Sequence, residues 1–172
     1  TTGIDATYNE YQFHFVNIHP ATDDVSFEFQ VNAHDGSSQL TGFNEVMTTT
    51  MFTAYHDEAD SATHMDYRTD TDVDASITMD QAQGTAEQWL GSYRVGNDAD
   101  QSVSGILKLY DPSSTTYVKH FVSEGNGVYA GDYSIAMYGA GYINTTNALT
   151  QIKFQFNSGN IDAGTIHMYG VG

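Results

Sequence analysis

The stretch Tyr11-Gln12-Phe13-His14-Phe15 places an aromatic side chain at every second position, with polar residues between. Successive side chains of an extended strand point to opposite faces, so this spacing gives one aromatic face and one wetter face. Aromatic and β-branched residues are also the types that strands favour. The stretch therefore predicts a strand that buries its aromatic face in a core.

The same alternation returns near both ends of the chain, at residues 25–31 and 152–156. Further strands are predicted between turn signals such as Asp111-Pro112 and Gly125-Asn126-Gly127. These strands are expected at 46–54, 85–95, 102–110, 116–122, 128–137 and 165–170. About 8 to 10 short strands at this spacing indicate an all-β, two-sheet antiparallel sandwich of jelly-roll-like form.

The length and composition fit a single domain over residues 1–172 that buries one core. The chain has no cysteine, which excludes disulfides, thiolate metal sites and a cysteine nucleophile. Because it starts at Thr1 and not at Met, we expect it to be part of a longer gene product, lacking a preceding N-terminal segment.

The charge is strongly one-sided, with 22 acidic residues against 5 Lys and Arg and a net charge of −17. Such a chain repels phosphate backbones, so nucleic acid is not an expected partner. Anionic membrane surfaces are disfavoured for the same reason. No apolar run approaches the roughly 20 residues of a membrane-spanning helix.

Residues 57–83 read as a long acidic connection with short strands near 63–67 and 75–79. Within it, Asp70, Asp72 and Asp74 offer the hard oxygen ligands that calcium prefers. An EF-hand loop would continue with Gly and Glu where this chain has Ala75 and Gln81. The EF-hand reading fails, which leaves a looser cation site or a solvated acidic loop. We predict no metal and no cofactor.

No catalytic motif stands out, since the chain has no G-x-S-x-G, no phosphate-binding glycine loop and no H-E-x-x-H. Exposed aromatic rings are the remaining candidates for ligand binding, because they stack on sugars. The candidates are Trp89, with Tyr129 and Tyr133, in a run that continues to Tyr138 and Tyr142. Aromatic residues also fill sandwich cores, so packing is the alternative interpretation.

The stretch 158–170, Ser-Gly-Asn-Ile-Asp-Ala-Gly-Thr-Ile-His-Met-Tyr-Gly, resembles the S-G-N-I-x-x-G-T-I-x-L-Y-G-like ending of small virion proteins of marine and cyanobacterial tailed phages. The openings at 3–13 and 17–20 and the segment 111–117 are similar to the same family. Met168 replaces the usual Leu, and Val171-Gly172 extend the end. The last two strands, joined by residues 159–164, are expected to pair as a hairpin.

The resemblance implies a jelly-roll-like sandwich on the virion surface. The first hypothesis is a non-enzymatic structural component, either a head decoration protein or a domain of a neck or tail appendage. Its expected partners are other virion proteins and copies of itself, as a homotrimer or higher oligomer. The alternative is a carbohydrate-binding sandwich at a fibre tip that recognises a host glycan. A glycan-degrading enzyme is the third and least favoured hypothesis.

Overall fold

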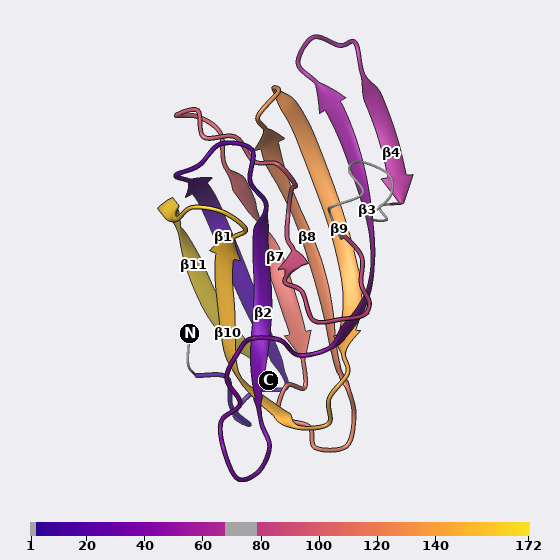
Figure 1. The fold of residues 1–172 in the computed structure, drawn as a ribbon, viewed down its shortest axis with the longest axis vertical. Helices are drawn as coiled ribbons and strands as arrows, with labels where there is room; N and C mark the ends of the chain where they lie inside the picture. Colours follow the sequence, from indigo (N-terminus) through magenta and orange to yellow (C-terminus); the bar gives the residue numbers. More distant parts are fainter. Residues whose placement is uncertain (1–2, 68–78) are drawn as a thin grey trace.

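A computed structural model describes residues 3–67 and 79–172 of the chain (Figure 1). The described residues form eleven strands and no helix. They are β1 (Glu10–Pro20), β2 (Phe27–His34), β3 (Met47–Asp57), β4 (Thr63–Tyr67), β5 (Ala82–Gly84), β6 (Gln88–Trp89), β7 (Val103–Tyr110), β8 (Lys119–Tyr129), β9 (Tyr133–Ile143), β10 (Ala148–Phe156) and β11 (Ile161–Val171). The strand expected at 75–79 lies, except for its last residue, outside the described residues.

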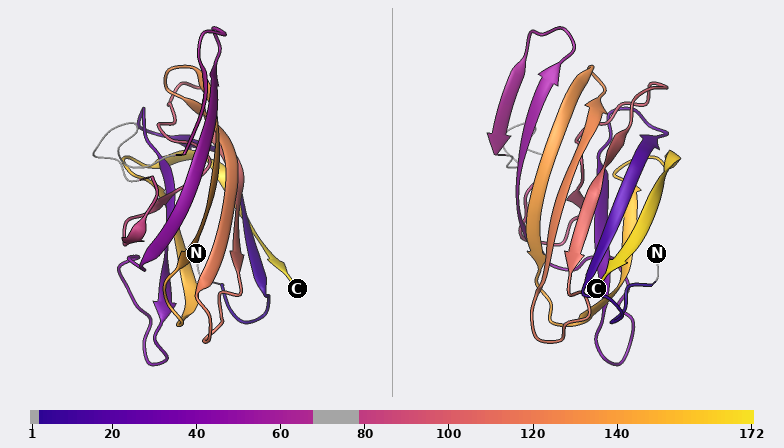
Figure 2. Two further views of the ribbon diagram at one scale, coloured as in Figure 1. Left: turned by 90° about the vertical axis from the view of Figure 1, so that its right-hand side faces the viewer. Right: turned by 180° about the vertical axis from the view of Figure 1, so that it is seen from behind.

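The strands form two antiparallel sheets that pack face to face (Figures 1 and 2). The large sheet has the order β11-β1-β7-β8-β9-β3-β4, with β5 added beside β3, and the small sheet has the order β10-β2-β6. The prediction of an all-β two-sheet sandwich is confirmed. Within the residues that the structure describes, no helix is long and apolar enough to cross a membrane.

The chain changes sheet at six connections, which lie on either side of β2, of β6 and of β10. The expected hairpin of the last two strands is therefore wrong, because β10 pairs with β2 and β11 pairs with β1. The turn itself is present, with Gly159 at a φ of 73°. The amide of Asn157 donates to Ser26, and the amide of Ala21 donates to Asn160, so the connection bridges the sheets.

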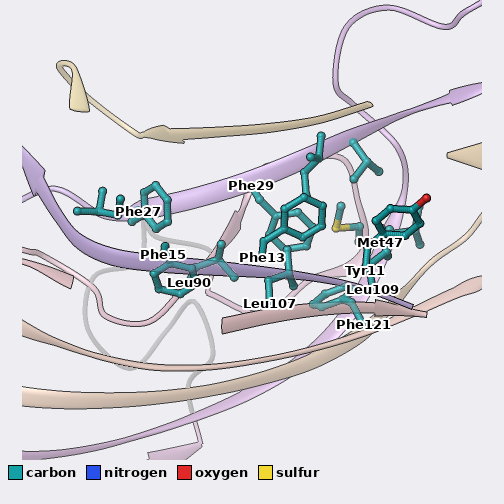
Figure 3. Close-up of a cluster of buried hydrophobic side chains, with 14 of the residues drawn as sticks. Tyr11, Phe13, Phe15, Phe27, Phe29, Met47, Leu90, Leu107, Leu109 and Phe121 are labelled. Carbon is teal, nitrogen blue, oxygen red and sulfur yellow. The ribbon is translucent and has the colours of Figure 1, made fainter. Parts of the chain in front are cut away.

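Aromatic rings from both sheets fill the core (Figure 3). The inward side chains of β1 are Tyr11, Phe13 and Phe15, as their alternation predicts, and all are buried. Ring centroids lie 5.3 Å apart between Phe15 and Phe27. Strand β2 is buried on both faces from Phe27 to Ala33, which makes it the centre of the domain.

A second core cluster lies where the large sheet extends beyond the small one. It contains Met51, Met79, Trp89, Tyr93, Ile135 and Met137. The chain after Met79 covers this part of the inner face. Only Gln88–Trp89 of the strand expected at 85–95 forms a strand, and Val95 makes isolated bridges to Val25 and Tyr129. The positive φ values of Gly91 (72°) and Arg94 (55°) turn the chain here, so a longer strand does not form.

The glycines of Gly125-Asn126-Gly127 lie inside β8, so the turn expected there is wrong. A Cβ on Gly125 would come within 2.6 Å of the Cα of Gly91. Close packing therefore selects glycine at this position. The chain reverses after Tyr129 instead, where Asp132 has a φ of 62°.

The outer face of the small sheet is covered by the protein's own chain. The side-chain amide of Gln30 donates to the backbone carbonyls of Glu45, Thr85 and Ala86. Glu28 is also buried on this face, and burial raises the pKa of its carboxyl group above 4.5 although Gln155 donates a hydrogen bond to it. The outer face of the large sheet is thus the broad sheet surface left open.

Replacing Phe27 with Ala should lower the free energy of unfolding by about 3 to 5 kcal/mol, because the buried ring contacts other core rings and leaves a cavity. Urea denaturation of the purified protein measures this change. The control Tyr117→Ala removes a ring that is 68% exposed and should change stability by less than about 0.5 kcal/mol. Equal effects of the two substitutions would contradict the assigned core.

Replacing Glu28 with Gln should raise the urea midpoint at neutral pH. The raised pKa means that the folded state favours the protonated carboxyl group, so stability falls as pH rises from 4.5 through the raised value. Gln keeps the neutral form at every pH, and the gain should vanish near pH 4, below the ordinary Glu value. The exposed Glu58→Gln serves as the control. A gain that is the same at both pH values would contradict this prediction.

Candidate functional site

The outer face of the large sheet carries most of the large apolar side chains that the structure exposes. Figure 2 (right) looks onto this face, from β4 at one edge to β11 at the other. Cross-strand register places eight exposed residues on it: Val16, Phe52, Met65, Tyr67, Val122, Tyr138, Tyr169 and Val171. Scattered apolar residues are ordinary on a protein surface, whereas a gathered set marks a contact surface.

Two shallow troughs lie side by side in the middle of the outer face. Thr50, Ala140 and Val122 are cross-strand neighbours on β3, β9 and β8, and they line both troughs. The volumes are about 400 Å³ and about 250 Å³. The floor is low because this row has small side chains between rows of rings.

Aromatic pairs flank the shared row on each side. On one side, Phe52 and Tyr138 stack with centroids 5.1 Å apart and ring planes at 15°. On the other, His120 and Tyr142 meet edge to face with centroids 6.4 Å apart. The pairs lie two residues along the strands from the shared row in opposite directions, so they stand about 14 Å apart.

A short polar network borders the larger trough. The side-chain amide of Gln83 donates to the Thr48 hydroxyl (2.7 Å) and to the Tyr142 hydroxyl (3.4 Å). Asn144 in turn donates to the amide oxygen of Gln83 at 2.8 Å. The network fixes the orientation of Gln83 and places its polar groups at the rim of a mainly apolar trough.

Charge is nearly absent from the outer face. Glu10, Lys108 and Glu124 are the Asp, Glu, Lys or Arg residues at its described outward positions on the large sheet. The net charge of −17 is therefore carried mainly elsewhere. A partner that meets this face encounters little of the repulsion that the rest of the domain exerts.

Trp89 does not lie on this face. It is 6% exposed and packs in the second core cluster with Met51 and Met137. Its strand pairs with β2, opposite Glu28. The interpretation of Trp89 as a sugar-stacking ring is therefore wrong, because its ring is enclosed by the protein.

The four tyrosines of the run separate into two groups. Tyr129 and Tyr133 are half-buried at the reversal between β8 and β9, with centroids 5.5 Å apart. Tyr133 also meets Tyr55 at 5.6 Å, so these rings pack mostly against each other. Tyr138 and Tyr142 instead border the troughs. Half of the run thus belongs to the candidate site.

The acidic candidates Asp70, Asp72 and Asp74 lie outside the described residues. Across residues 3–67 and 79–172, no group of three or more His, Asp or Glu side chains is arranged to hold a metal ion. The candidate site that the described residues support is the outer face, with its exposed apolar side chains and two troughs.

Sequence reasoning did not single out Phe52, His120 and Val122. The available signal lay in the neighbouring strand β9, where Tyr138, Ala140 and Tyr142 alternate with residues that point inward and so mark the outer face. Alternation assigns residues to a face of one strand, but it does not say which strands are neighbours. Phe52 and Tyr138 become a pair only once β3 lies beside β9.

Comparison of the chain with protein-family models, with curated proteins and with solved structures finds no match.

Proposed function

We propose that this domain is a non-enzymatic structural component of a tailed-phage virion, as a head decoration protein or a domain of a neck or tail appendage. It attaches through the outer face of the large sheet to a neighbouring virion protein. The observation that carries the proposal is the gathering of exposed apolar side chains on a face with few charges.

The composition of this face supports a protein partner. The centres of protein interfaces are depleted in charged residues and enriched in Tyr, Phe and Met. Phe52, Tyr138 and Val122 occupy the middle of the face, and Met65 and Tyr67 extend it onto β4. The troughs provide hollows into which side chains of a partner can insert, as they do at energetically important contacts.

The setting on a virion rests on the resemblance of residues 158–170 to the endings of phage virion proteins. The acidic remainder of the surface fits this setting, because a large net charge keeps particles soluble and apart. The trimeric or higher assembly expected from the sequence stays a prediction.

Carbohydrate binding is the second candidate, and the aromatic pairs beside the troughs favour it. Tyr138, Tyr142 and His120 present rings on which a sugar can stack, with Gln83 at the rim. The net charge of −17 disfavours an anionic glycan, so a neutral glycan is the expected ligand. Both troughs are mainly apolar, whereas sugar sites need several hydrogen-bonding groups, so a protein partner is favoured.

Replacing Val122 with Glu should reduce the amount of this domain on purified particles by about tenfold or more, because the charge would be buried at the centre of the contact. Val122 is suited to this test because it lines both troughs and is 43% exposed, so the fold tolerates the change. Quantitative mass spectrometry and imaging of particles give the occupancy. Tyr117→Glu adds the same charge at an exposed loop position and should leave occupancy unchanged.

Absence of the wild-type chain from particles, or equal incorporation of the Val122→Glu variant, would rule out the proposal. The second candidate has its own readout in binding to an array of neutral glycans. Binding there that is lost in both Tyr138→Ala and Tyr142→Ala, with Tyr117→Ala unaffected, would favour carbohydrate recognition.

A further inference from the structure

Strand β11 forms an open edge of the large sheet. It spans eleven residues, Ile161–Val171, and pairs on one side with β1. Among residues 3–67 and 79–172, no strand or turn hydrogen-bonds to its other side. Figure 2 (right) shows β11 at the margin of the sheet. An edge of this kind presents a row of backbone donors and acceptors to another strand.

The edge has few of the features that usually prevent strand pairing. Proteins protect edges with lysines, prolines, inward charges, β-bulges or short strands. The pairing of β11 with β1 is irregular between Ile161 and Ala163, next to Gly164 at a φ of 111°, and regular from Thr165 to Val171. Strand β11 has no Lys, Arg or Pro, and Asp162 is its single acidic residue. Two other edge strands of the described structure differ, since β10 carries Lys153 and β4 has five residues.

The N-terminal segment packs on the end of β11 without closing the edge. The ring of Tyr8 lies against Gly170, where a Cβ would come within 2.1 Å of the ring, and Gly3 lies near the end of the Met168 side chain. These are side-chain contacts with the strand. The backbone of Asn9 instead accepts a hydrogen bond from Asp111.

We infer that β11 pairs with β11 of a second copy of this chain, antiparallel and about a two-fold axis at Ile166, so that the two large sheets join into one. A two-fold contact matches a surface with itself, and an antiparallel strand is complementary to its own copy. Ile166 is the middle residue of Ile161–Val171, so an axis there places every residue of β11 opposite a residue of the other copy.

Charge favours a second copy at this position. Two domains of charge −17 repel each other, so they associate where acidic residues are few. With the axis at Ile166, Asp162 faces Gly170 of the other copy, and the two Asp162 residues stand about 27 Å apart along the strands. That separation exceeds the screening length of about 8 Å at physiological ionic strength.

The pairing is separate from the proposed attachment through the outer face. The edge uses the backbone of β11, whereas the outer face uses side chains centred on β3, β8 and β9. A joined sheet leaves both outer faces open on the same side. The dimer would therefore present two attachment faces, and this inference holds whether or not the partner is a virion protein.

Single cysteine variants test the pairing directly, because the chain has no cysteine of its own. Residues on the axis face their own copies, at a Cα separation of about 4.5 to 5.5 Å that suits a disulfide. Mild oxidation of Ile166→Cys should therefore give a covalent dimer on a non-reducing gel. Met168→Cys is the matched control, since its copies would stand about 14 Å apart along the strands.

A monomeric Ile166→Cys protein after oxidation, or crosslinking through Met168→Cys in its place, would overturn the inference. Sedimentation equilibrium supplies a second readout that does not depend on the half-buried Ile166. Thr165→Lys should weaken the dimer by about tenfold or more through repulsion between paired edges. Thr116→Lys in an exposed loop should leave it intact.

The Val122→Glu variant separates the two proposals. This variant should remain a dimer and lose attachment to particles, whereas the direct effect of Thr165→Lys should be a weaker dimer. A wild-type chain that sediments as a monomer at every concentration tested would reject the pairing of β11 and leave the outer-face proposal standing.

Discussion

The structure depends on the enclosure of β2 between the large sheet and the chain that crosses its other side. Phe27 and Phe29 pack into the rings of Phe15 and Phe121, while Gln30 on the opposite face binds the carbonyls of the covering segments. Every polar group of so buried a strand needs a partner, which fixes the course of those segments. The inner face of the large sheet is thereby buried, and its outer face and free edge remain available for contacts with other molecules.

Alternation of residue types predicted the sandwich because burial on one face leaves a direct trace in a strand. It identified the inward faces of β1, β2 and β10 correctly. It could not assign β10 and β11 to different sheets, because partner choice depends on residues far away in the sequence. The turn predicted at Gly125 was wrong for a related reason. The glycine is needed there for close packing against Gly91, a residue far away in the sequence.

The candidate site was only half predictable. Tyr138 and Tyr142 stand out in the sequence as aromatic residues, whereas Trp89 stands out equally and is buried. Whether such a ring is exposed or buried depends on whether a second layer of the fold covers it, and the composition of the sequence does not predict this. The low charge of the outer face could not be predicted from the net charge of −17 either. Acidic residues are spread along the sequence, and only the fold determines which of them lie away from this face.

The pairing of β1 has a consequence for how the protein forms. Its two neighbours in the sheet are β7, which follows about ninety residues later, and β11, which follows about 150 residues later. Contacts between such distant segments form slowly, since a long loop must close before any of them is gained. A chain still emerging from the ribosome holds the aromatic strand β1 without these partners until β7 and β11 have been made, and the strand is exposed to chaperones meanwhile.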